Sequence, residues 1–144
     1  MLKKTIFGLF LIAAFCVSNA LAQSVRTPEK NSAERTAILN ALRVPVEKEM
    51  KQKIQFAVDH FNVQGNWAFL DGVLQSTTGG APNFKITDYQ KRIDVDAFDN
   101  NVFALLKKTG GKWKIITYQI GCTDVCYLPW TDDYKAPKAI FPGA

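Results

Sequence analysis

The sequence predicts an α+β domain: an N-terminal helix packed on an antiparallel sheet of about four strands in two hairpins, with an irregular C-terminal tail. Three observations support this fold class. Apolar residues recur at helical spacing over 31–45, and they alternate with polar residues over 54–74. They alternate again over 101–120, on both sides of a Thr-Gly-Gly turn. A helix followed by two hairpins is typical of a helix that covers one face of a sheet.

The helix is expected to begin after Asn31 or Ser32, because either side chain can accept a hydrogen bond from the first turn. One face of this helix carries the apolar residues Ala37, Ile38, Ala41 and Leu42. We expect Pro45 to end the helix, because the residue before a proline leaves the α region. A short further turn over 46–51 would then begin at the proline.

The first hairpin is expected over 54–74, with its turn at Gln64-Gly65-Asn66. The alternation of apolar and polar residues shifts by one position around His60-Phe61, which predicts a bulge or a bend in the first strand. The second strand, Trp67 to Leu74, is apolar on both sides. This pattern predicts a central strand or one that is covered on both faces.

The rest of the domain contains a loop over 76–83, an ambiguous segment over 87–99 and a second hairpin over 101–120. The ambiguous segment fits a short helix capped by Thr87 and also fits an extended piece. In the last strand we expect two apolar faces, one with Trp113 and Ile115, the other with Ile116, Tyr118 and Ile120. The tail is rich in aromatic residues and proline, so we expect it to pack back over the sheet or a sheet edge, with one helical turn near Trp130 to Tyr134.

Residues 1–22 have the three parts of a signal peptide that is cleaved after Ala22. Two lysines precede an apolar run from Thr5 to Val17, and Ala20-Leu21-Ala22 supplies the small residues before the cut. The run is shorter than the ~20 residues that a membrane-spanning helix needs. We therefore expect a periplasmic or secreted chain without stable membrane insertion, in which 23–30 form a flexible lead-in and 31–144 a single domain.

Cleavage changes the charge and the cysteine count. The net charge falls from +5 to +3 because the signal segment holds two lysines and no acidic residue. With no dense run of Lys and Arg, nucleic acid is not an expected partner. Cys16 is removed as well, and Cys122 and Cys126 remain as a pair that is expected to form a disulfide in an oxidising compartment. Free thiols or a functional pair are the alternatives.

Metal and cofactor sites are not expected. The chain has one histidine and no further cysteine to complete a zinc ligand set. The acidic residues Asp88, Asp94, Asp96 and Asp99 do not follow the calcium-loop pattern, so we interpret them as solvated caps and turns. No nucleophile-elbow, zinc-protease or phosphate-loop motif occurs, so no catalytic residue is assigned and no cofactor is implied.

Four segments carry a resemblance to a known group: Arg35 to Arg43, Gly65 to Phe69, Leu105 to Trp113, and Gly121 to Val125. With these segments in this order, the chain resembles a family of uncharacterised exported bacterial proteins, over nearly all of its length after residue 22. The resemblance implies a helix-then-sheet layout of the cystatin-like or nuclear-transport-factor-2-like kind. These folds host binders, inhibitors and enzymes, so no activity is implied. It also implies that the cysteine pair is an accessory of this chain, because other members can lack it.

The candidate binding residues are Tyr127, Trp130 and Tyr134 in the tail, with Asp124 beside them, and His60. They suggest a small exported binding or accessory protein, such as an inhibitor or immunity-type partner of an envelope enzyme. Its partner would be a protein or another envelope component. The alternative is a small enzyme with a pocket between helix and sheet, in which His60 or Asp124 performs acid–base chemistry. Asp59 would point away from His60 along the strand, whereas Asp71 on the facing strand could orient it.

Overall fold

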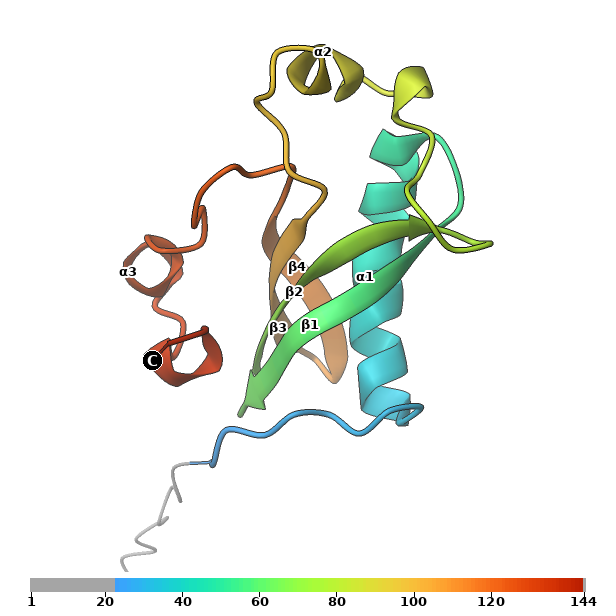
Figure 1. Cartoon of the computed structure of the whole chain (residues 1–144). Helices are drawn as coiled ribbons and strands as arrows, with labels where there is room; N and C mark the ends of the chain where they lie inside the picture. The colour runs from blue at the N-terminus through green and yellow to red at the C-terminus, as the bar shows by residue number, and fades with distance from the viewer. Residues whose placement is uncertain (1–22, 144) are drawn as a thin grey trace, which may run out of the picture.

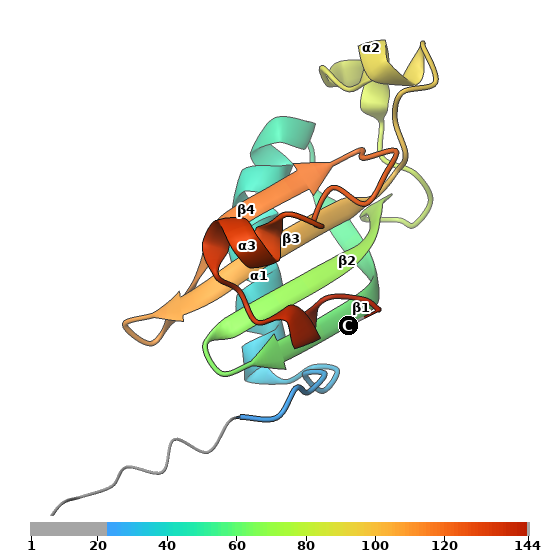
Figure 2. The ribbon, with the colours of Figure 1, turned by 90° about the vertical axis from the view of Figure 1, so that its left-hand side faces the viewer.

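The computed structural model describes residues 23–143, so the predicted signal segment lies outside the described residues. One helix lies on one face of an antiparallel sheet of strand order β1-β2-β3-β4, and the C-terminal tail lies on the other face (Figures 1 and 2). The α+β prediction is confirmed. The elements are α1 (Ala33–Met50), β1 (Ile54–Gln64), β2 (Trp67–Ser76), η1 (Phe84–Ile86), α2 (Gln90–Ile93), β3 (Val102–Thr109), β4 (Lys112–Ile120), α3 (Trp130–Tyr134) and η2 (Lys138–Ile140).

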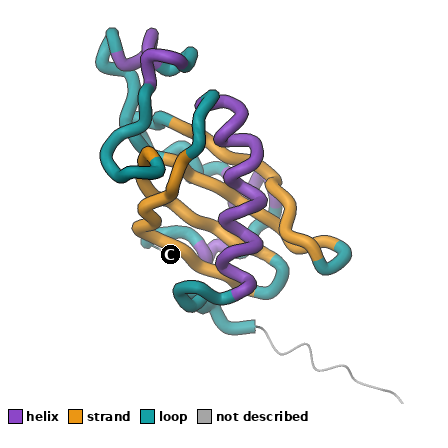
Figure 3. Tube along the Cα trace, turned by 90° about the vertical axis from the view of Figure 1, so that its right-hand side faces the viewer, coloured by secondary structure: helices purple, strands orange, loops and turns teal. Residues whose placement is uncertain are grey.

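Helix α1 crosses the sheet at a slant and is longer than predicted (Figure 3). It begins as expected at the cap Ser32, whose hydroxyl accepts a hydrogen bond from the Arg35 backbone N–H at 3.2 Å. The predicted end at Pro45 is wrong, because the helix continues to Met50. Every fourth residue along one face is fully buried against the sheet: Ile38, Leu42, Val46 and Met50. Burial of the last two side chains outweighs the backbone hydrogen bond that the proline removes.

Strand β1 contains the predicted irregularity. Its pairing with β2 shifts between Val58 and His60, so one extra residue separates them. The segment that we expected to be a flexible lead-in is attached to this strand. Arg26 and Val63 exchange two backbone hydrogen bonds of 2.9 and 2.8 Å, and the Arg26 guanidinium lies 2.5 Å from the Glu34 carboxylate.

Strand β4 contains a second bulge, at Ile116. The residues on either side of it, Ile115 and Thr117, pair with consecutive residues of β3. The extra residue returns Tyr118 and Ile120 to the side that faces α1, where both join the core. The prediction that these two side chains face away from Ile115 is therefore wrong, because strict alternation fails at a bulge.

Both faces of the sheet are buried. On the side away from α1, Phe69 of β2 and Leu105 of β3 pack with tail residues, as expected for a central strand and a docked tail. The predicted helical turn at Trp130 to Tyr134 is helix α3. The ambiguous segment contains the short helix α2, and the Thr87 hydroxyl accepts from the Tyr89 N–H at 3.2 Å ahead of it. The tail side of the core also contains Trp130, Ala136, Ile140 and Phe141.

Candidate functional site

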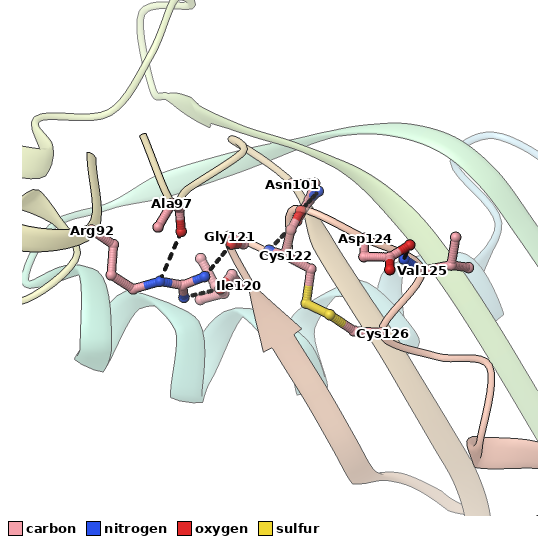
Figure 4. The surroundings of a disulfide bond; sticks show 9 residues. All are labelled: Arg92, Ala97, Asn101, Ile120, Gly121, Cys122, Asp124, Val125 and Cys126. Atoms are coloured by element: carbon pink, nitrogen blue, oxygen red, sulfur yellow. Dashed lines mark hydrogen bonds between the residues drawn. A yellow bond between two sulfur atoms is a disulfide. The ribbon is translucent and has the colours of Figure 1, made fainter. Parts of the chain in front are cut away.

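The tail begins with a short loop closed by Cys122 and Cys126, whose sulfur atoms are joined as a disulfide (Figure 4). Asn101, the residue just before β3, fixes the start of this loop. Its side-chain amide donates to the Cys122 carbonyl at 2.6 Å and accepts from the Cys122 N–H at 2.9 Å. The Asp124 carboxylate accepts from the Val125 N–H at 2.7 Å. The loop is therefore held by a side-chain clamp and a covalent bond together.

Arg92 connects α2 to the end of β4 just before the disulfide loop (Figure 4). Its guanidinium donates to the carbonyls of Ala97 at 3.1 Å, Ile120 at 3.3 Å and Gly121 at 2.5 Å. Gly121 has a φ of +77°, and its missing side chain leaves room for the ring of Phe98. This junction fixes the direction in which the chain leaves the sheet.

Two of the three predicted tail aromatics face inward. Trp130 is 4% exposed and Tyr127 is half-buried, and their ring centroids lie 6.2 and 4.9 Å from that of Phe69. Tyr127 also stacks on Phe141 at 5.9 Å. Burial, and next the charge of Asp71, raise the pKa of the Tyr127 phenol. These rings anchor the tail to the sheet.

The outward surface of the tail is formed by other residues. Leu128 is 70% exposed, and Val125 and Tyr134 are each 38% exposed. Together with the exposed Asp124 we call these four residues the tail surface. Sequence reasoning identified Asp124 and Tyr134 but missed the two aliphatic residues, because periodicity gives no sign of exposure in an irregular segment.

His60 lies beneath the tail, against Ile140 of η2. Its Nε2 is 2.8 Å from the Ile140 carbonyl oxygen, and its ring meets Phe69 edge-on at 5.8 Å. Asp71 is the direct partner of His60 on β2, as the sequence suggested. Burial raises the pKa of the Asp71 carboxyl, and the nearby histidine opposes that shift. The hydrogen bond between His60 and the Ile140 carbonyl therefore helps to hold the tail on the sheet.

A groove of about 710 Å³ lies on the opposite side of the sheet, between the last turns of α1, residues 88–92 and β4. Glu49 of α1 is its central polar group. The Tyr89 hydroxyl donates to one Glu49 carboxylate oxygen at 2.6 Å, and the Tyr118 hydroxyl donates to the other at 3.1 Å. Lys48 and Lys51 line the same groove. Neither His60 nor Asp124 lines it.

Both phenols in this groove are held in their neutral form. Burial, followed by the charge and hydrogen bond of Glu49, raises the pKa of Tyr118 to about 12. Burial and the same carboxylate raise the pKa of Tyr89 still further above its ordinary range. Perturbed titratable groups converging in a groove are a general sign of a binding site.

Sequence reasoning missed this groove for a specific reason. Tyr89 and Tyr118 lie 40 and 69 residues from Glu49 along the chain. Tyr118 reaches the α1 side only because of the bulge at Ile116. The one available signal was the pair of adjacent isoleucines, which breaks the alternation of the strand.

Within residues 23–143, no group of three or more His, Cys, Asp or Glu side chains is placed to hold a metal ion. The four aspartates over 88–99 are exposed, and one of them, Asp94, accepts from the Gln90 side chain at 2.7 Å. In the same part of the chain, no helix is both long and apolar enough to cross a membrane.

Comparisons with protein-family models, with curated proteins and with solved structures found no match to this chain. The resemblance to exported bacterial proteins therefore stays a prediction.

Proposed function

We propose that this chain is an exported binding or accessory protein, which acts in the periplasm or outside the cell and recognises a protein or another envelope component through its tail surface. Two features support export. The first 22 residues have the order of parts of a cleavable signal peptide. The two cysteines that remain after residue 22 lie at disulfide-bonding distance, a state that persists in oxidising compartments.

The observation that carries the binding function is the exposure of Leu128. A leucine that is 70% exposed is held in the tail between the disulfide loop and α3. Val125 and Tyr134 are partly exposed on the same segment. Several exposed apolar side chains on one ordered segment can form the kind of apolar patch that marks a protein interaction site.

The segment that carries the tail surface is held in one conformation by contacts within the chain itself. The Asn101 clamp and the disulfide hold the end that leaves β4, and the packing of Tyr127 and Trp130 on Phe69 holds the next turn. A fixed loop loses little conformational freedom on binding, which favours affinity. A protruding apolar residue on such a loop suits the cleft of an envelope enzyme, as an inhibitor or immunity-type partner would require.

Site-specific photo-crosslinking tests this proposal. A photoreactive amino acid replaces Leu128 in the full chain, which is expressed with its own first 22 residues. Val95 is the matched control, because it is also 70% exposed but follows α2 two residues after its end. Figure 1 shows α2 well away from α3. We expect a discrete adduct with an envelope component from position 128 and none from position 95. The recovered chain is expected to begin at Gln23.

The proposal also predicts the effect of charge at the same position. Leu128→Asp places a carboxylate where an apolar contact is expected, and the fold is unaffected because the side chain is exposed. We expect adduct formation from a second photoreactive residue at 125 to fall at least about tenfold. Equal adducts at positions 95 and 128, or an adduct that survives Leu128→Asp, would exclude the tail surface as the recognition site.

A further inference from the structure

The groove at Glu49 has a floor that accepts hydrogen bonds. The Glu49 carboxylate receives the phenolic hydrogens of Tyr89 and Tyr118. A phenol carries a single hydrogen, so each hydroxyl that donates to Glu49 offers only its lone pairs to a ligand. The carboxylate is also an acceptor. The floor therefore suits a ligand group with several N–H donors, and a positive charge strengthens those hydrogen bonds.

Around Glu49 the lining of the same groove has more positive than negative charge, because three basic residues line it and Asp88 is the one further acidic residue. Lys48 and Lys51 line it, and within residues 23–143 neither takes part in an ion pair. Arg92 also lines the groove. Its guanidinium is held by three backbone carbonyls, which fixes its position without neutralising its charge. A ligand that reaches these basic residues needs an anionic group.

We propose that this groove binds a small zwitterion, an amino acid or a short peptide, with its ammonium group at Glu49, Tyr89 and Tyr118 and its carboxylate at Lys48 and Lys51. The aromatic faces of the two tyrosines add a favourable surface for the ammonium group. The groove, at about 710 Å³, is within the range of small-molecule sites and has room for more than one residue of a peptide.

Charge complementarity favours a zwitterion over simpler ligands. A plain anion would meet the Glu49 carboxylate, and a plain cation would meet the lysines and Arg92. A neutral sugar could use the hydrogen-bonding groups but would leave the charges of the groove unmatched. The ligand class thus follows from the presence of both charges in one groove.

Titration of the isotope-labelled chain with diglycine, followed by amide chemical shifts, tests this proposal. The comparison ligands are N-acetylglycine, which keeps only the carboxylate, glycinamide, which keeps only the ammonium group, and glucose. We expect shifts from diglycine at residues 48–51, 89–92 and 118, and at least about tenfold weaker binding of each comparison ligand. Equal or tighter binding of any comparison ligand would overturn the zwitterion assignment.

Glu49→Gln is the decisive variant, and Glu29→Gln is its matched control, since it removes the same charge at an exposed position outside the groove. We expect Glu49→Gln to weaken diglycine binding about tenfold or more and Glu29→Gln to leave it unchanged. Phenolate absorbance confirms that the variant keeps its groove. The pKa of Tyr118 should fall from about 12 toward 10.0 but remain above it, because burial still opposes ionisation.

Absence of diglycine shifts in the wild-type chain, or equal affinities for the Glu49→Gln and Glu29→Gln variants, would refute the site. This result would leave the proposed function intact, because the groove and the tail surface lie on opposite faces of the sheet and share no residue. Conversely, Leu128→Asp should not alter diglycine binding. The two proposals can therefore fail independently.

Discussion

Replacing Phe69 with alanine is expected to lower the free energy of unfolding by about 3–5 kcal/mol and to release the tail. Phe69 is fully buried, and its ring contacts His60, Tyr127, Trp130 and Phe141. Within residues 23–143, no other ring takes part in as many aromatic pairs on this face of the sheet. Its removal leaves a cavity at the centre of the layer that attaches the tail to the sheet. Denaturant unfolding measures the loss of stability.

Leu70→Ala is the matched control for this prediction. Leu70 is the next residue of β2 and is also fully buried, but it faces α1. We expect a loss of about 2–5 kcal/mol with the tail still docked. Trypsin under native conditions distinguishes the two variants, because Lys135 and Lys138 are exposed in the tail. Cleavage there should accelerate more in Phe69→Ala than in Leu70→Ala; equal acceleration would contradict the role given to Phe69.

Gly121→Ala is expected to have the second large effect, a loss of about 3 kcal/mol or more. Two costs add at this position. A φ of +77° is unfavourable for any residue with a Cβ, and that Cβ would overlap the ring of Phe98. Displacing Phe98 would also disturb Tyr89, whose ring lies 5.4 Å from it. Thermal and denaturant unfolding measure the effect.

Gly110→Ala separates these two costs. Gly110 has a φ of +58°, and an added Cβ would meet no atom within 4 Å. We expect this control to lose only about 1–2 kcal/mol, the cost of the left-handed backbone alone. If the two variants lost the same amount, steric overlap with Phe98 would not be the reason that position 121 is glycine.

The sequence was sufficient to predict the order and type of the main elements. The apolar spacing of Ile38, Ala41 and Leu42 and the alternation over 101–106 correctly indicate side chains that face the core, whereas Ala37, predicted on the same helix face, is exposed. The sequence was insufficient to predict that the helix continues past Pro45 and that β4 contains a bulge at Ile116. The local preference of Pro45 predicts that the helix ends there. Burial of Val46 and Met50 against the sheet nevertheless keeps the chain helical to Met50. Such a tertiary effect depends on residues that are distant in sequence.

The candidate sites were predicted less completely than the fold. The cysteine pair and the aromatic tail could be identified from composition, and the opposition of His60 and Asp71 from hairpin register. Which tail aromatics face inward depends on their contacts with Phe69, which no local pattern specifies. The groove at Glu49 unites three elements, and one of its tyrosines is placed there by a bulge.

Docking of the tail on the sheet is the central structural claim, because the tail surface exists only if it holds. Hydrogen–deuterium exchange of the chain from Gln23 onward tests it directly. The amides of Trp130, Ile140 and Phe141 donate only to carbonyls three residues back, so they are protected only if the surrounding packing keeps these turns closed. We predict that they exchange slowly, at rates near those of β2. Exchange at the rate of an unstructured peptide would show that the tail is undocked and would contradict the account.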